Sequence, residues 1–327
     1  MKRILSVIFS FFVFSLPLCN SVEQNIQQAQ SEISLSSNPK NSIWSSLANY
    51  FLFFGVGDDS KCLGNLSEKF IIEELNIAWE SIKIHGYVFE PKDKIYDKIC
   101  ICFGSDFRPC HRMVTTDIDD SILYVCVDYP GFGQSEYIYM NEYILTNFAN
   151  RVYDYVSESY KDYDLIAFGF SLGGFSASLM CSKEKIKKVI LVSPVYLTGM
   201  LSKFFSESKS RYLVKLLWGY ELNSWKNIFE CNRDCDILLY SGDEKDFLSL
   251  YHTLLFYFRS YLKNEKSNKQ KLDKVKSIIE KNYKNLDVGI SIYENCWHHQ
   301  IHSRVVRENK DLFSLDRSES TSDLDAA

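Results

Sequence analysis

Ser171 lies at the centre of the sequence Gly169-Phe170-Ser171-Leu172-Gly173-Gly174, a pattern that suits a serine nucleophile. An apolar run at 164–168 precedes it and predicts a buried strand. Small residues at 175–180 follow and predict a helix. A serine between glycines at such a strand-to-helix turn sits on a sharp, strained bend that exposes its hydroxyl. The glycines are needed because strand and helix backbones approach closely there. We therefore predict that Ser171 attacks a carbonyl carbon.

A second glycine motif supports this prediction. The sequence Asp128-Tyr129-Pro130-Gly131-Phe132-Gly133-Gln134-Ser135 follows an apolar run at 122–127. Together with Ile84-His85-Gly86, Pro91 and the strand that ends at Gly104, these motifs stand in the order found in the α/β-hydrolase superfamily. The chain resembles that superfamily over roughly residues 70–313. Two ordered motifs at consistent spacing are far more specific than either alone.

The resemblance implies that the acid and the base of a catalytic triad follow the serine in the order Ser, Asp or Glu, His. A serine hydroxyl needs such a base, and the base needs a carboxylate to orient it. For the base we prefer His298, with His299 as the alternative and His302 third. For the acid we prefer Asp246, with Asp243 as the alternative. The family pattern has an Asp three residues after Gly, whereas here Lys245 stands three residues after Gly242.

The oxyanion of the tetrahedral intermediate needs backbone N–H donors. The resemblance assigns one to Leu172, directly after the nucleophile. It assigns the other to Ser105, or to its neighbour Asp106, in the loop that follows the strand ending at Phe103.

The resemblance and the pattern of apolar runs predict one fold class, the α/β-hydrolase fold. It would have a mostly parallel central sheet, helices on both faces and a helical cap insertion at roughly 197–230. Besides the helix after Ser171, helices are predicted at 147–160 and 248–261. The strands are expected at 71–79, 82–91, 99–103, 122–127, 165–168, 189–194, 236–240 and 288–293.

The cap segment is rich in apolar residues, which favours an acyl substrate. A helical face is predicted from Leu213, Leu216, Leu217 and Tyr220. We expect a serine hydrolase that cleaves a carboxylic ester or thioester of a small-molecule or lipid substrate. The alternatives are a peptidase of the same fold and an inactive hydrolase-fold binding protein. No metal or organic cofactor is implied.

Charge and composition limit the other partners. The net charge is −5, which argues against nucleic-acid binding as the main role. The lysine-rich run at 263–284 suggests peripheral contact with anionic lipid headgroups as one hypothesis, and a solvated helix face as the simpler one. The sequence does not indicate an oligomeric state.

The chain ends predict processing and export. Residues 1–19 read as a signal peptide, since Met1-Lys2-Arg3 precedes an uncharged apolar run. A membrane anchor is the alternative. Residues 20–60 read as a linker that includes an aromatic-rich, amphipathic segment, 61–315 as the hydrolase domain and 316–327 as a disordered tail. Of the ten cysteines, Cys231 and Cys235 are close enough in sequence to form a disulfide, and either could pair elsewhere.

Overall fold

The computed structural model describes residues 63–315, except for 81, 106–109, 116, 137, 139–140, 219, 232, 244–245, 247 and 310. The predicted signal peptide, the linker with its amphipathic segment and the C-terminal tail therefore lie outside the described residues. Within the described part, no helix has both the length and the apolar character needed to cross a membrane.

Eight strands of the described chain form one sheet, in the spatial order β1-β2-β4-β3-β5-β6-β7-β8. β1 and β2 form an antiparallel hairpin, β2 pairs antiparallel with β4, and every other neighbouring pair is parallel. The strands are β1 (Phe70–Trp79), β2 (Ile82–Pro91), β3 (Lys98–Phe103), β4 (Leu123–Val127), β5 (Asp164–Phe170), β6 (Ile186–Val192), β7 (Cys235–Gly242) and β8 (Leu286–Tyr293).

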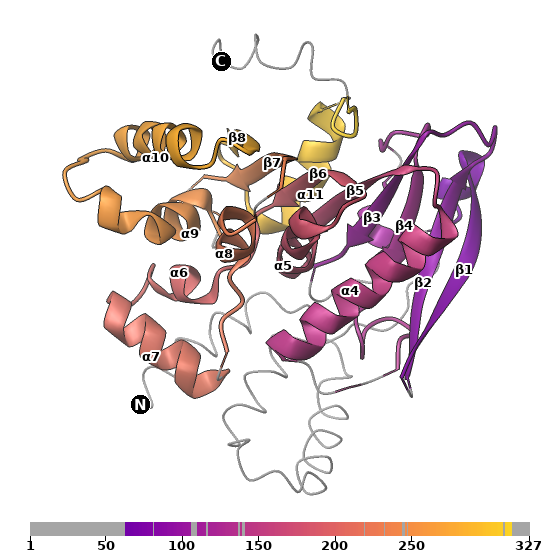
Figure 1. The fold of residues 1–327 in the computed structure, drawn as a ribbon, viewed down its shortest axis with the longest axis horizontal. Coiled ribbons are helices and arrows are strands. Elements are labelled where there is room, and N and C mark those ends of the chain that lie inside the picture. The colour runs from indigo at the N-terminus through magenta and orange to yellow at the C-terminus, as the bar shows by residue number, and fades with distance from the viewer. Residues whose placement is uncertain are drawn as a thin grey trace, which may run out of the picture.

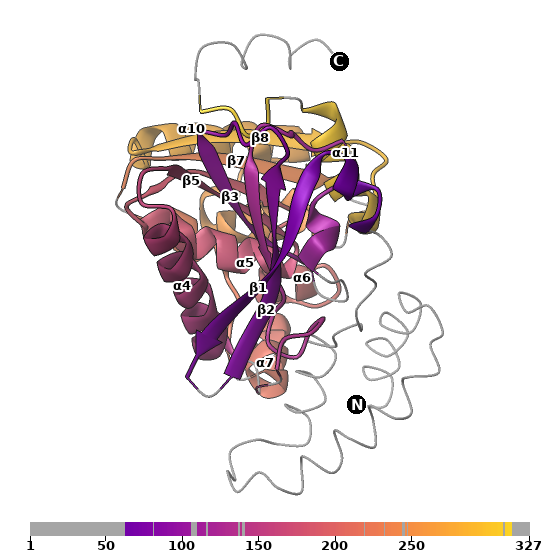
Figure 2. The ribbon, with the colours of Figure 1, turned by 90° about the vertical axis from the view of Figure 1, so that its right-hand side faces the viewer.

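Both faces of the sheet are covered, which explains the continuous apolar runs (Figures 1 and 2). Successive side chains of a strand point to opposite faces. In β3, Ile99, Ile101 and Phe103 accordingly join one core, whereas Cys100 and Cys102 join the other. The helices are α4 (Glu142–Ser159), α5 (Leu172–Leu179), α6 (Leu197–Leu201), α7 (Glu207–Leu217), α8 (Ser224–Phe229), α9 (Leu250–Tyr257), α10 (Asn268–Asn282) and α11 (His298–Glu308).

Helices α4, α5, α8 and α10 contribute to the first core and α11 to the second, so they lie on opposite sides of the sheet (Figure 2). Short 3₁₀ helices at Leu66–Glu68, Cys110–Met113, Met180–Ser182 and Arg259–Tyr261 complete the described elements. The predicted fold class, a mostly parallel sheet covered by helices, is confirmed.

Three short helices, α6, α7 and α8, occupy the connection from β6 to β7, where the cap was expected. The predicted apolar face of α7 is partly wrong. Leu216 is 44% exposed, whereas Val214 and the following Trp218 are buried. Residues four apart share a helix face, so the buried stripe runs through Val214 and Trp218 instead.

The cysteines of the described chain are free thiols. Cys231 and Cys235, considered as a disulfide pair, are both buried and unbridged in this structure. The thiols of Cys100, Cys102 and Cys126 are buried within β3 and β4 and pack as small apolar groups.

Candidate active site

Ser171 occupies the turn between β5 and α5. Its backbone has φ 57° and ψ −115°, a conformation that non-glycine residues rarely adopt. Hydrogen bonds hold it there: its N–H donates to Val192 O at 2.9 Å, and its carbonyl accepts from Gly174 N at 3.0 Å and from Val195 N at 3.2 Å. The strained bend is thus fixed by β6 and by the first turn of α5, and the Ser171 side chain stands at the carboxyl end of the sheet.

The two glycines of the motif are required by close backbone contacts. A Cβ on Gly173 would lie 1.9 Å from Phe103 O, and a Cβ on Gly169 would lie 2.3 Å from Gly173 O. Neither position can hold a side chain without moving the backbone. Glycine at position 173 therefore lets α5 approach the end of β3, beside the residue expected to supply an oxyanion donor.

His298 is the first residue of α11, and its imidazole joins the predicted nucleophile to the predicted acid. Its Nε2 lies 3.0 Å from Ser171 Oγ, and its Nδ1 lies 2.9 Å from Asp246 Oδ1. Both contacts are satisfied by the tautomer with its proton on Nδ1, which donates to the carboxylate while Nε2 accepts from the serine. The ring also stacks on Phe170, with centroids 5.0 Å apart, and this packing limits its rotation.

Asp246 is fully buried and accepts three hydrogen bonds, one of them from His298, which is also its ion-pair partner. Oδ1 accepts from His298 and from Leu248 N at 2.9 Å, and Oδ2 accepts from Ser193 Oγ at 2.5 Å. Burial acts to raise the pKa of this carboxyl. The charge of His298 and the hydrogen bonds from His298, Ser193 and Leu248 outweigh it, so the pKa lies below its ordinary value. Asp246 is therefore held as a carboxylate.

Asp243, the alternative acid, has a different contact. Its Oδ2 accepts a hydrogen bond from Asn295 N at 2.8 Å, and its own N–H donates to Tyr293 O at 3.0 Å. Of the two carboxylates, Asp246 is the one that accepts from His298 Nδ1. Asp243 links the loop after β7 to the loop after β8.

The other two histidines considered for the base are placed differently. His302 is buried one turn further along α11, where its ring stacks on Phe168 with centroids 5.4 Å apart. The backbone of His299 lies in the first turn of α11, and the position of its side chain is outside what the structure describes. The contacts to Ser171 and Asp246 are made by His298.

The predicted oxyanion donors lie at the same end of the sheet. Leu172 is the first residue of α5, where backbone N–H groups have no partner within the helix. Ser105 is buried and follows β3, next to the Phe103 and Gly104 carbonyls against which Gly173 packs. Asp106 falls in a gap of the described chain. Leu172 and Ser105 thus follow the carboxyl ends of the paired strands β5 and β3, at the end of the sheet where Ser171 stands.

The Asp128 motif supports the scaffold around this site. The buried Asp128 carboxylate contacts His85 Nδ1 through Oδ2 at 3.0 Å and accepts from Cys110 N through Oδ1 at 2.7 Å. Gly133, with φ 52°, has no room for a Cβ, which would lie 2.1 Å from Asp128 Oδ2. One carboxylate therefore ties together β2, the turn after β4 and the chain that returns from the end of β3.

Ser193 was missed as a site residue by sequence reasoning. The sequence showed it only as the end of a strand, before Pro194. A signal was present, because a polar residue at the carboxyl end of a strand beside the nucleophile strand must reach the same edge of the sheet as Ser171.

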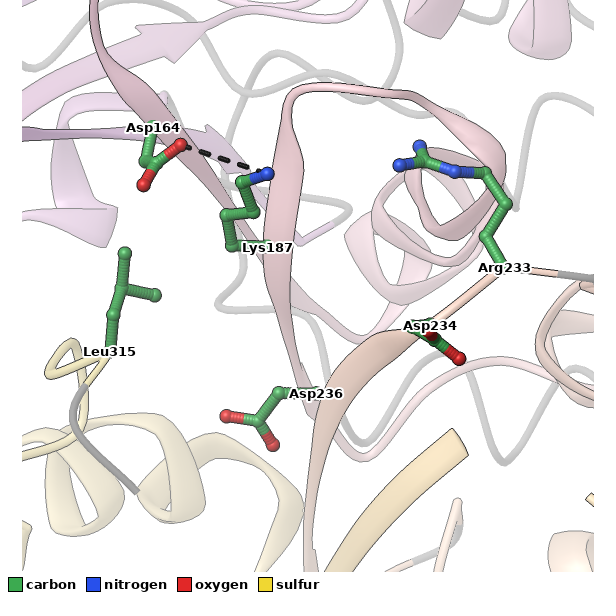
Figure 3. A pocket seen from close by; sticks show the side chains of 6 residues that line it. All are labelled: Asp164, Lys187, Arg233, Asp234, Asp236 and Leu315. Carbon is green, nitrogen blue, oxygen red and sulfur yellow. Dashed lines mark ion pairs between the residues drawn. The ribbon is translucent and has the colours of Figure 1, made fainter. Parts of the chain in front are cut away.

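One hollow among the described residues lies elsewhere. It has a volume of about 430 Å³ and is lined by Asp164, Lys187, Arg233, Asp234, Asp236 and Leu315 (Figure 3). Asp164 and Asp236 stand at the amino ends of β5 and β7, whereas Ser171 follows the carboxyl end of β5. Lys187 and Asp164 form an ion pair at 3.9 Å on one side of it. This hollow is separate from the cluster of Ser171, His298 and Asp246.

The described residues contain no group of three or more His, Cys, Asp or Glu side chains arranged to bind a metal ion. The chemistry available at the cluster is that of a serine hydroxyl, an imidazole and a carboxylate in series.

The sheet order, the strained serine turn and the positions of the histidine and carboxylate loops define the α/β-hydrolase fold. The sequence profile of the alpha/beta hydrolase fold family matches residues 110–235. This match supports the predicted resemblance to the α/β-hydrolase superfamily. No significant match to a curated protein was found.

Solved structures share this fold at low sequence identity. An alpha-beta hydrolase from Vibrio vulnificus is 14% identical, with a TM-score of 0.61 over 84% of this chain and 96% of its own. An esterase from Pyrococcus furiosus is 18% identical, with a TM-score of 0.50 over 79% of this chain and 95% of its own. An acylaminoacyl peptidase from Pyrococcus horikoshii is 14% identical, with a TM-score of 0.51 over 83% of this chain and 46% of its own. These likenesses concern the fold and leave the substrate open.

Proposed function

We propose that this protein is a serine hydrolase that cleaves a carboxylic ester or thioester through an acyl-enzyme. The observation that carries the proposal is the series of contacts from Ser171 Oγ to His298 Nε2 at 3.0 Å and from His298 Nδ1 to Asp246 at 2.9 Å. These distances lie within the range that proton transfer from a nucleophile to a base requires. The strained turn of Ser171 adds a second, independent argument.

In the first half of the reaction, Ser171 Oγ attacks the carbonyl carbon while His298 Nε2 takes the hydroxyl proton. The carbonyl π electrons move onto oxygen, and the N–H groups of Leu172 and Ser105 stabilise that oxyanion. When the carbonyl re-forms, the bond to the leaving group breaks. The imidazolium gives its proton to the departing alcohol or thiol, which leaves an acyl-serine.

In the second half, water replaces the serine as nucleophile. His298 takes a proton from water, the hydroxide attacks the acyl carbon, and the collapse of the second tetrahedral intermediate returns the proton to Ser171 Oγ. Asp246 remains a carboxylate throughout, because its burial is matched by several donors. Its charge stabilises the imidazolium that forms in each half.

An apolar acyl group is the substrate class that we favour. Trp297 directly precedes His298 in the chain, at the start of α11, and 53% of its surface is exposed. Among the described residues, large exposed apolar side chains are few, and an indole next to a reaction centre suits contact with an apolar ligand. The apolar cap segment also supports this choice.

Labelling with a fluorophosphonate probe tests the nucleophile without knowledge of the substrate. We expect the folded wild-type protein to be labelled, and Ser171→Ala and His298→Ala to lose the label. Ser176→Ala is the matched control. Ser176 is a buried serine in α5, the helix that follows Ser171, and it takes no part in the hydrogen bonds that join Ser171 to His298 and His298 to Asp246. Absence of labelling in folded wild-type protein would refute the proposal and favour the inactive binding protein.

A substrate panel then separates the reaction types. Esters and thioesters of increasing acyl length are compared with aminoacyl amides of the same leaving group. We expect the highest kcat/KM for a medium or long acyl ester or thioester. A preference for aminoacyl amides would favour the peptidase instead.

A further inference from the structure

Ser193 makes a contact with the proposed acid that the hydrolase chemistry above does not use. It follows β6 and is fully buried, and its Oγ donates to Asp246 Oδ2 at 2.5 Å. The other carboxylate oxygen, Oδ1, faces His298 Nδ1. The carboxylate is therefore held from both sides, by a hydroxyl on one oxygen and by the imidazole on the other.

The backbone of Ser193 adopts a strained conformation that glycine would adopt more easily. Its φ is 44°, in the left-handed region that favours glycine, and its N–H donates to Tyr240 O at 2.8 Å. Glycine would adopt this conformation at no steric cost but would carry no hydroxyl. Strain kept at a buried residue beside a reaction centre points to a role for the side chain.

The loop that carries the acid gives the hydroxyl a specific task. Asp246 stands four residues after Gly242, the last residue of β7. The loop turns back through a hydrogen bond from Asp246 N to Asp243 O at 3.1 Å, and a Cβ on Gly242 would lie 2.8 Å from Asp246 Cβ. Ser193, which directly follows the neighbouring strand β6, holds Oδ2 of this carboxylate from outside the loop.

We propose that Ser193 is a positioning residue that holds the Asp246 carboxylate in the orientation in which it accepts the hydrogen bond from His298 Nδ1–H. The proposal rests on the proposed function, since it concerns the same series of residues. Ser193 acts through Asp246 and does not touch the reacting atoms. With Leu248 N and His298 on Oδ1 and Ser193 on Oδ2, rotation of the carboxylate about its Cβ–Cγ bond would break one of these hydrogen bonds.

Two substitutions separate the hydroxyl from the backbone. Ser193→Ala removes the hydroxyl and keeps the strain, whereas Ser193→Gly removes the hydroxyl and relieves the strain. We expect both to lower the rate of fluorophosphonate labelling about tenfold, the effect of losing one hydrogen bond to a charged group. Ser193→Gly should unfold near the wild-type temperature. Wild-type labelling by Ser193→Gly would overturn the proposal, because a merely conformational role is better filled by glycine.

A double-mutant cycle tests whether Ser193 acts through Asp246. In the Asp246→Asn background, Ser193→Ala should change the labelling rate by less than about twofold. A further tenfold loss there would mean that Ser193 acts by another route, and would overturn the proposal. Ser224→Ala is the control. The Ser224 hydroxyl is also buried, and it donates at 2.8 Å to the carbonyl of Val195, which lies two residues after Ser193.

The proton NMR signal of His298 Nδ1–H provides a readout that needs no catalysis. We expect a far-downfield resonance in the wild type that is absent in His298→Ala. It should move upfield and exchange faster with water in Ser193→Ala, and remain unchanged in Ser224→Ala. An unchanged resonance in Ser193→Ala would overturn the positioning role. If the probe fails to label the wild type but this resonance responds to Ser193→Ala, the proposed function fails while the positioning role stands.

Discussion

Asp243 Oδ2 accepts a hydrogen bond from Asn295 N at 2.8 Å, and this contact joins the two loops that carry the proposed acid and base. Asp243 lies three residues before Asp246, and Asn295 lies three residues before His298. The same loops touch at Gly242, where a Cβ would lie 2.5 Å from Cys296 O. The distance from Asp246 to His298 therefore depends on contacts outside the side chains that would carry out the chemistry.

The two carboxylates of the acid loop should differ sharply when each is changed to its amide. Asp246→Asn should lower kcat on an ester substrate about a thousandfold or more, because the amide no longer favours the Nδ1–H tautomer of His298. Asp243→Asn should lower it no more than about fivefold, the effect of one weakened hydrogen bond to a backbone N–H. Steady-state kinetics on the first ester found to be cleaved measure both. The reverse ranking would assign the acid to Asp243.

Acid stability should report the low pKa of Asp246. A carboxyl whose folded-state pKa lies below its ordinary value of about 3.9 contributes stability that is fully present above that value. This contribution is lost as the pH falls through the folded-state pKa. Below about pH 4, the Tm of the wild type should therefore fall more steeply than that of Asp246→Asn. Calorimetry between pH 2 and pH 7 checks this, and parallel curves would contradict it.

Replacing each of the three histidines of α11 by Phe should affect the rate of fluorophosphonate labelling to different degrees. His298→Phe should lower the labelling rate at least about a thousandfold, since the imidazole bonded to Ser171 is lost. His302→Phe should stay within about threefold of wild type, because a phenyl ring keeps the stacking on Phe168. His299→Phe should behave like His302→Phe, because His298 already makes both contacts of the series. A loss of labelling in His299→Phe alone would move the base by one residue.

Strand positions were predictable from the sequence where burial on both faces made apolar runs continuous, as in β3 and β4. β6 begins three residues earlier than the apolar run at 189 suggested, because Lys188 is buried with an ion pair to Asp236 at 3.1 Å. α4 begins at Glu142 and not at 147, because the Asn141 side chain accepts from Ile144 N and starts the helix early. A capping asparagine is visible in sequence, whereas the partner of a buried lysine is not.

The nucleophile turn was predictable because close backbone contacts require glycine at positions 169 and 173, and these glycines are visible in the sequence. For the base and the acid, the sequence left several candidates within a few residues of each other. The loop after Gly242 holds both Asp243 and Asp246, and only the folded loop shows which carboxylate turns toward His298. Ser193 carries no motif, since its role depends on a contact between residues 53 positions apart.

Gly173→Ala should damage both stability and reactivity. The added Cβ would lie 1.9 Å from Phe103 O and 2.6 Å from Gly104 O, so α5 must move away from the end of β3. We expect a loss of about 1–3 kcal/mol in the free energy of unfolding, as for other overpacked sites. Labelling of Ser171 should also fall by more than the unfolded fraction accounts for, because Leu172 and Ser105 would separate.

Gly289→Ala is the control, since its Cβ would meet only the flexible end of Leu238, at 2.9 Å. Urea unfolding and labelling of both variants decide the matter, and a Gly173→Ala protein as stable and as reactive as the control would show that α5 does not depend on this contact.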